Sequence, residues 1–265
     1  MKNLKKLFVL GMAVIMVLAM TACGGSDEPE SDTVYVKDKG TLVVGITEFE
    51  PMDYKDEEGN WIGFDADMAT AFAESLGVDV EFTVIDWDNK IMELDGKSID
   101  VVWNGMTLTD EVTSSMGTTT PYCKNAQVVV LPKDKADQYK TEESIKDLSF
   151  AAEAGSAGEK ILKEMECEVT SVTTQADALM EVAAGTSDAC VIDLLMAGAM
   201  IGEGTSYEDL TYTVALNEED YGVGFRQGSD LVDALNQFFK DAYADGTMME
   251  IAEKYGVQES VVEQK

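Results

Sequence analysis

The chain has 265 residues, of which 45% are hydrophobic, so it can bury a sizeable core in one large domain or two ordinary ones. It has 51 Asp and Glu residues against 19 Lys and Arg, a formal net charge of −32, and therefore lacks the clustered basic residues that nucleic-acid binding requires. It contains no His, the commonest general base and metal ligand. We expect no nucleic-acid partner, no bound metal and no cofactor.

Residues 1–22 are predicted to be a signal peptide, because three lysines precede an apolar run that is short for a membrane-spanning helix. The sequence MTAC that follows resembles the bacterial lipobox, in which the Cys becomes the lipid-modified first residue of the mature chain. We interpret residues 23–39 as lipidated Cys23 and a flexible tether, since GGSDEPESD is small, acidic and free of apolar side chains. The protein is therefore expected to be extracytoplasmic and anchored to the cell membrane by Cys23.

The three remaining cysteines, Cys123, Cys167 and Cys190, are an odd set without CxxC spacing. This pattern argues against a disulfide framework or a zinc site. We expect buried free thiols, with one bridge between Cys167 and Cys190 as the alternative.

Strand and helix patterns alternate in the first part of the chain, which implies a parallel sheet with right-handed crossovers. A helix is predicted to begin near Phe64 and to stop at Gly77, because apolar residues recur there at helical spacing. A shorter helix is predicted over residues 88–96. The predicted strands are residues 40–46, 78–85 and 98–105.

A second cycle of the same kind begins near Asp147. Its predicted strands are residues 148–155, 166–172 and 187–193, and its predicted helices are residues 156–166 and 174–184. Two short apolar segments, residues 125–132 and 220–228, fit extended crossings between the two halves. The final helices, over about residues 230–255, are expected to pack on the first half.

The sequence therefore predicts an α/β fold with two lobes, two hinge crossings and a ligand cleft between the lobes. Lobe 1 is expected to comprise residues 40–127 plus 221–265, and lobe 2 residues 128–220. Ligands of open α/β sheets bind beyond the carboxyl ends of the strands, and domain interfaces are favoured pocket sites.

Three motifs resemble those of the extracytoplasmic solute-binding proteins of ABC importers, in the branch that binds polar amino acids (bacterial solute-binding protein family 3). They are GFDADMATAFAESLG, the pair DVVWNGMTLTDE and TTTPY, and GTSDACVID. The similarity spans roughly residues 40–255. It implies the type II periplasmic-binding-protein-like fold, a small amino acid or amine as ligand, and an ABC transporter permease as partner. It also implies a monomer without enzymatic activity.

In lobe 1 the resemblance implies that Phe49 and Trp87 place aromatic rings on the ligand. It implies that Gly105, through its backbone, and Thr107, through its hydroxyl, receive the ligand carboxylate. A structural interpretation stays open for each: the two aromatic residues can belong to the core, and Thr107 can close a turn.

In lobe 2 the resemblance implies that Ser156 and Ala157, at the start of a helix, offer backbone N–H groups to an anion. Asp193 would bind the α-ammonium group, and Glu153 occupies a cleft-facing position where some amino-acid binders carry a base. Here too a structural role is the alternative, with Ser156 as a helix N-cap and Glu153 on a solvent-facing strand end.

The chain departs from the family pattern at one position in particular. The family has an Arg that binds the ligand carboxylate, and the resemblance puts Val112 at that position. Arg226 is the only Arg in the chain, and we expect it to be structural. An α-amino acid held by N–H groups, a cationic amine without carboxylate recognition, and a cyclohexadienyl dehydratase-like enzyme using Glu153 as general acid all stay open. We favour a binding protein for an amino acid or a related amine-bearing solute.

Overall fold

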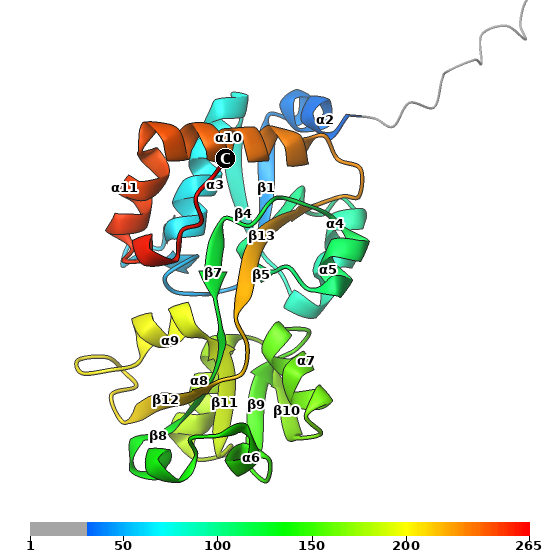
Figure 1. Cartoon of the computed structure of the whole chain (residues 1–265). Helices are drawn as coiled ribbons and strands as arrows, with labels where there is room; N and C mark the ends of the chain where they lie inside the picture. The colour runs from blue at the N-terminus through cyan, green and yellow to red at the C-terminus, as the bar shows by residue number, and fades with distance from the viewer. Residues whose placement is uncertain (1–30) are drawn as a thin grey trace, which may run out of the picture. The chain divides into compact units, whose positions relative to one another are not determined.

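The computed structural model describes residues 31–265. The predicted signal peptide, Cys23 and the first part of the predicted tether lie outside the described residues. Two larger sheets organise the described part of the chain, with helices around each sheet (Figure 1). We call the described residues around the first sheet lobe 1 and those around the second sheet lobe 2. This is the two-lobed α/β fold that the sequence predicts.

The sheet of lobe 1 has the strand order β4-β1-β5-β13-β6, with β7 paired to β13. Strand β1 lies parallel to β4 and β5, whereas β13 lies antiparallel to β5. The strands are β1 (Thr41–Ile46), β4 (Asp79–Val84), β5 (Val101–Thr107), β6 (Gly117–Thr118), β7 (Cys123–Asn125) and β13 (Glu219–Phe225).

The sheet of lobe 2 has the strand order β10-β9-β11-β8-β12. Strand β9 is parallel to β10 and β11, and β8 is antiparallel to both β11 and β12. The strands are β8 (Gln127–Pro132), β9 (Ser149–Glu153), β10 (Glu168–Val172), β11 (Ala189–Asp193) and β12 (Leu210–Ala215).

The chain passes between the lobes twice, from β7 to β8 and from β12 to β13. Gln127 begins the second sheet and Glu219 begins the last strand of the first, so both crossings lie just before the expected lobe boundaries. Both sheets are mixed rather than parallel, because β8 and β13 enter their sheets directly from the other lobe without a crossover helix.

The helices agree with the prediction where apolar residues recur at helical spacing over a long segment. Helix α3 (Phe64–Leu76) ends at Gly77, which takes the left-handed conformation with φ 78°. Helix α11 (Thr247–Lys254) packs on α3 and helix α10 (Leu231–Asp245) on β13, so the final helices lie on lobe 1 as predicted. The remaining helices that bear on the site are α4 (Lys90–Asp95), α5 (Asp110–Ser115), α7 (Ala157–Glu164), α8 (Gln175–Ala184) and α9 (Leu194–Met200).

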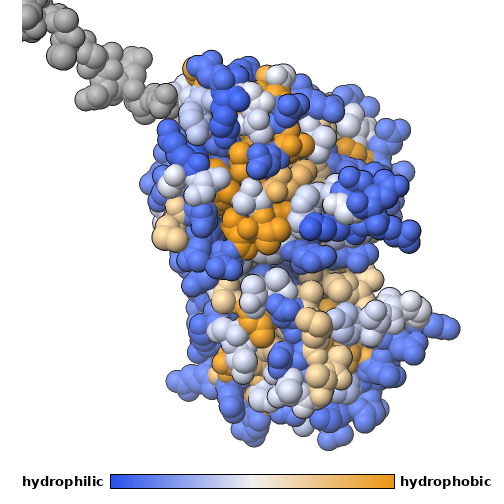
Figure 2. All heavy atoms as spheres, turned by 180° about the vertical axis from the view of Figure 1, so that it is seen from behind, coloured by the Kyte–Doolittle hydropathy of each residue, from blue (hydrophilic) through white to orange (hydrophobic). Residues whose placement is uncertain are grey.

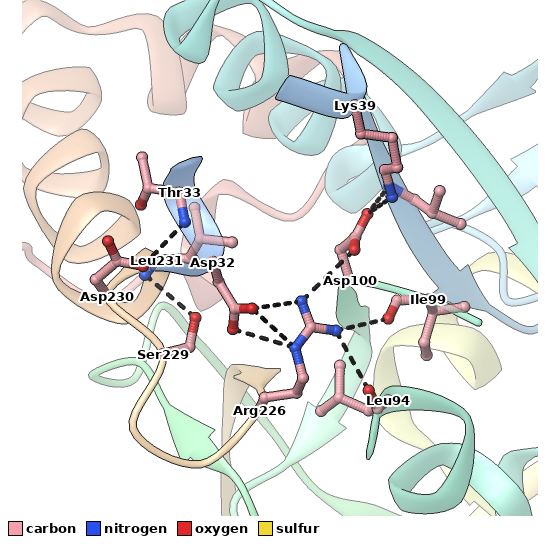
Figure 3. Close-up of polar contacts among 11 residues, drawn as sticks. Asp32, Thr33, Lys39, Leu94, Ile99, Asp100, Arg226, Ser229, Asp230 and Leu231 are labelled. Carbon is pink, nitrogen blue, oxygen red and sulfur yellow. Dashed lines mark hydrogen bonds and ion pairs between the residues drawn. The ribbon is translucent and has the colours of Figure 1, made fainter. Parts of the chain in front are cut away.

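The predicted tether is wrong for its last residues, because Asp32–Lys39 form helix α2. Val36 is fully buried, and the Asp32 carboxylate accepts hydrogen bonds from Nε and Nη2 of Arg226 at 2.8–3.1 Å (Figure 3). Arg226 also donates to the carbonyls of Leu94 and Ile99 through Nη1. The expected structural role of Arg226 is confirmed, and this role explains why the N-terminal segment is ordered.

An aromatic cluster lies in the core of lobe 1, where Trp103 packs against Phe72, Tyr122 and Phe239. Figure 2 shows many hydrophilic residues on the face that it draws, with apolar residues gathered most densely in the middle of its upper part and in smaller groups elsewhere, including the lower part. Within residues 31–265, no helix combines the length and the apolar character needed to cross a membrane.

The three cysteines of the described residues are free thiols. Cys123 and Cys190 are buried, as expected, and burial raises the pKa of each thiol. Cys167, the residue before strand β10, is only half-buried. The alternative of a bridge between Cys167 and Cys190 is wrong.

Candidate functional site

A cavity of about 430 Å³ lies between the lobes and is the candidate ligand site. It meets the carboxyl end of β5 in lobe 1 and the carboxyl ends of β9 and β11 in lobe 2, where ligands of α/β sheets bind. Its lobe 1 wall includes Trp87, Lys90, Asn104, Gly105, Thr107 and Val112. Its lobe 2 wall includes Gln127, Glu153, Gly155, Ser156, Ala157, Gln175 and Asp193.

Gly105 shapes the lobe 1 wall where β5 approaches the turn that holds Phe49. Its φ is +53°, and a Cβ there would come within 2.5 Å of the Phe49 ring. Its N–H donates to the Asp65 carboxylate at 2.7 Å, inside the lobe. The Gly105 N–H is therefore already used within lobe 1. In this structure it is not free to donate to a ligand carboxylate, which is the contact predicted for it.

The two predicted aromatic contacts have different positions. Phe49 does not line the cavity; it is 2% exposed and meets Tyr221 edge-on in the core, with centroids 6.4 Å apart. The chain turns between Phe49 and Asp53, whose backbones form an isolated β-bridge, and this turn directs the Phe49 ring into the core. Trp87 does line the cavity, in the short 3-10 turn before α4. Thr107, at the end of β5, also lines it and is half-buried.

Ser156 and Ala157 lie where β9 turns into α7. The Ser156 hydroxyl accepts a hydrogen bond from the Glu159 N–H at 3.0 Å, so Ser156 is the N-cap of α7 and also lines the cavity. Its own N–H donates weakly to the Glu153 carbonyl at 3.2 Å. Ala157 is the first residue of α7 and lines the cavity beside it.

Asp193 is the last residue of β11 and is 4% exposed. Its carboxylate accepts hydrogen bonds from Asn125, Gln127, Tyr221 and Gln175. Three of these donors reach Oδ1, including the Tyr221 hydroxyl at 2.5 Å, whereas one reaches Oδ2. Burial, followed by the nearby Glu219, raises the pKa of Asp193 well above its usual range. Oδ2 is thus the Asp193 oxygen with remaining capacity for a ligand.

Glu153 is the last residue of β9 and is 2% exposed rather than solvent-facing. Its Oε1 has no hydrogen-bond partner among the described residues. Burial raises the pKa of Glu153 to about 8, although the Lys90 ammonium acts in the opposite direction. An unpartnered buried carboxyl oxygen on a cavity wall is a site that a ligand donor can satisfy.

Lys90 is the cavity residue that sequence reasoning missed. It is 8% exposed, and its ammonium lies 4.9 Å from the centroid of the Trp87 ring. Burial lowers the pKa of Lys90, while Glu111, Glu153 and Asp88 act in the opposite direction. The available signal was the spacing: Lys90 follows Trp87 by three residues at the start of a predicted helix, which puts both side chains on one side.

Val112 lies in α5, lines the cavity and is 4% exposed. The position at which we expect the family Arg to fall therefore presents an apolar side chain to the cavity. The amides of Gln127 and Gln175 add polar groups that the sequence did not single out, and the amide of Asn104 also lines the cavity. Within residues 31–265, no cluster of three or more acidic or cysteine side chains is arranged to hold a metal ion.

Known proteins are similar to this chain in both sequence and fold. Residues 42–258 match the family of bacterial extracellular solute-binding proteins, family 3. The L-cystine-binding protein TcyJ of Escherichia coli (strain K12) is 28% identical, over 92% of each chain. A mutant of ArgBP from T. maritima has a TM-score of 0.79 at 30% identity, covering 84% of this chain and 98% of its own.

The ancestral amino acid-binding protein AncCDT-1, a precursor of cyclohexadienyl dehydratase, gives a TM-score of 0.78 at 30% identity. The match covers 85% of this chain and 99% of AncCDT-1. The family match spans most of the sequence, and these relatives extend over nearly all of both lobes. The chain belongs to the bacterial extracellular solute-binding proteins, family 3.

Proposed function

We propose that the chain is the substrate-binding protein of an ABC transporter and binds an amino acid or a related small amine-bearing solute by lobe closure. The observation that carries the proposal is the cavity between the lobes, whose buried charged residues are Lys90 from lobe 1 and Glu153, Glu159 and Asp193 from lobe 2. Such a cavity complements a small molecule that carries both charges. A ligand that contacts both lobes stabilises the closed form.

We also infer how the protein acts in the cell. As a member of an extracellular family, it meets its ligand outside the cytoplasm. We propose that lipidated Cys23 holds it at the cell membrane, that it delivers the ligand to an ABC permease, and that it works as a monomer. The relatives named above, which bind amino acids according to their names, support the ligand class.

Two other functions are less well supported by the site. A ligand with only positive charge would contact carboxylates of the cavity wall, but it would leave the buried Lys90 ammonium without an anionic group of the ligand. Dehydration of a cyclohexadienyl acid would use Glu153 as a general acid, and its raised pKa fits that role. The relative connected with that reaction is itself named as an amino acid-binding protein. We therefore propose binding without catalysis.

The test begins with whatever small molecule co-purifies with the protein, released by denaturation and identified by mass spectrometry. A thermal-shift panel of the amino acids and their decarboxylated amines then follows. A ligand at 100 times its Kd stabilises by about 2.7 kcal/mol, which is a shift of roughly 5–10 °C for a chain of this size. Absence of any shift across the panel would contradict the proposed ligand class. Turnover of a cyclohexadienyl acid would establish the enzyme instead.

A further inference from the structure

We propose that Lys90 recognises the anionic group of the ligand, in place of the Arg that Val112 replaces, and that Glu153 receives the ligand ammonium. The ligand is then a zwitterion whose two charges lie against opposite lobes. This inference rests on the proposed function and specifies which charges that ligand must carry.

The donors of Lys90 are only partly used. Its ammonium donates to the Trp87 carbonyl at 3.1 Å and to the Gly155 carbonyl at 3.2 Å. A lysine ammonium has three N–H donors, so one remains for a group in the cavity. Both present acceptors are neutral carbonyls. The carboxylates of Glu111, Glu153 and Asp88 act on Lys90 from a distance, but among the described residues no anionic group accepts a hydrogen bond from its ammonium. A ligand carboxylate would supply such a group.

The position of Lys90 depends on a close approach between the lobes. Gly155 belongs to lobe 2, yet a Cβ built on it would lie 2.6 Å from the Asp88 carboxylate and 2.8 Å from the Asp88 Cα of lobe 1. The φ of Gly155, +71°, also favours glycine. Because this glycine lets the backbones meet, Lys90 reaches the lobe 2 carbonyl and is enclosed by both walls.

The carboxylates of the cavity differ in their remaining capacity. Glu159 pairs with Lys163 at 2.7 Å, and Asp193 accepts hydrogen bonds from four side chains. Glu153, by contrast, leaves Oε1 without a partner among the described residues. Lys90 and Glu153 form no ion pair with each other within that part of the chain. The other charged residues of the cavity wall are exposed: Asp88, Glu111, Lys160, Lys163 and Glu164. Among the buried charged groups, Lys90 therefore offers an open donor and Glu153 a carboxyl oxygen with no partner, beside the partly used Oδ2 of Asp193. A zwitterion satisfies the donor and the carboxyl oxygen together.

Lys90 and the family Arg would recognise a ligand carboxylate in different ways. A lysine ammonium is a point charge, whereas a guanidinium binds a carboxylate through two parallel hydrogen bonds. The apolar Val112 side chain at the cavity wall adds no donor. Carboxylate recognition should therefore depend on the charge of Lys90, and its removal should affect only ligands that carry the anion.

The experiment compares each amino acid, cystine included, with its decarboxylated amine by calorimetry, for example arginine with agmatine and histidine with histamine. For an amino acid that binds the wild type, Lys90→Met should weaken binding by roughly 30-fold or more. Affinity for the matching amine should stay unchanged or increase. Lys90→Arg should keep the preference for the amino acid. The control is Lys146→Met, which removes an exposed lysine that pairs with Glu143 and should change neither affinity.

A second variant separates recognition from a structural effect. Adding Val112→Arg to Lys90→Met should restore the preference for the amino acid, because a guanidinium then enters the same cavity. Equal loss of amino acid and amine in Lys90→Met, or an unchanged preference, would overturn the role of Lys90 and leave the proposed function standing. If the wild type binds no amino acid and no amine, the proposed function itself is wrong, and this inference with it.

Discussion

Glu153 keeps its proton near neutral pH in the ligand-free protein, because burial raises its pKa to about 8. A ligand ammonium beside Oε1 favours the ionised carboxylate, so binding must release that proton below about pH 8. We predict that affinity for an amino acid increases from about pH 6 to pH 8, by up to about tenfold per pH unit, and is level above. Glu153→Gln should remove this dependence.

Calorimetry in buffers with different ionisation enthalpies measures the released proton directly. At about pH 6.5 the wild type should release close to one proton per ligand more than Glu153→Gln does. The chain has no His, but burial also raises the pKa of Asp65 to about 7 and that of Asp193 above its usual range. The difference between the wild type and Glu153→Gln therefore reports Glu153. A flat pH profile in the wild type would mean that the ligand ammonium does not contact Glu153.

Individual residues were predictable from the sequence when a motif placed them at a strand end. Thr107, Glu153 and Asp193 line the cavity because each ends a strand that points to it. Phe49 was not predictable, because its burial depends on the turn to Asp53 and on the glycine packed against its ring. The spacing from Trp87 was a local signal for Lys90, but the hydrogen bond from its ammonium to the Gly155 carbonyl of the other lobe cannot be derived from the sequence.

At the scale of elements, long periodic segments were predictable and short ones were not. Helix α3 has a regular apolar face and a glycine stop, and both are local properties of the sequence. Helix α2 has a weak pattern, and it is held by Arg226, which lies 194 residues away along the chain. Such a contact cannot be derived from the local sequence. The mixed sheets likewise result from β8 and β13 crossing between the lobes.

We predict that Arg226→Met destabilises the protein by about 3–5 kcal/mol, because it leaves the Asp32 carboxylate without its partner and removes one of the two cations beside Asp100, which keeps Lys39. The Asp32 side chain is 10% exposed and that of Asp100 is fully buried, and Arg226 Nη2 lies 2.8 Å and 3.6 Å from their oxygens (Figure 3). The midpoint of thermal unfolding should fall by roughly 10 °C. Amide exchange in α2 should accelerate as well, since α2 loses its partner.

The matched control is Lys124→Met. Lys124 pairs with Asp220 at 3.0 Å, but both side chains are exposed, so the loss should be about 0–1 kcal/mol. Equal unfolding midpoints for the two variants would show that the Arg226 contacts contribute no more than a surface pair.

At the scale of the whole molecule, we predict that Cys23→Ala releases the protein from the membrane. Each buried CH₂ of an acyl chain contributes about 0.8 kcal/mol, so two or more chains anchor a protein stably. In detergent partition the wild type should enter the detergent phase and the variant the aqueous phase. Mass spectrometry of the wild type should find an acylated Cys23 as the first residue. An unmodified Cys23 in membrane-bound protein would refute lipidation.

The insertion of lobe 2 within lobe 1 sets the order in which a growing chain can complete its lobes. All strands of the second sheet come from one continuous stretch, from β8 to β12. The first sheet needs β13, which lies between β5 and β6 and is synthesised after every strand of lobe 2. Until then β5 has an unpaired edge, which is a site for wrong pairing. The lobe whose synthesis begins first is therefore the last to be finished.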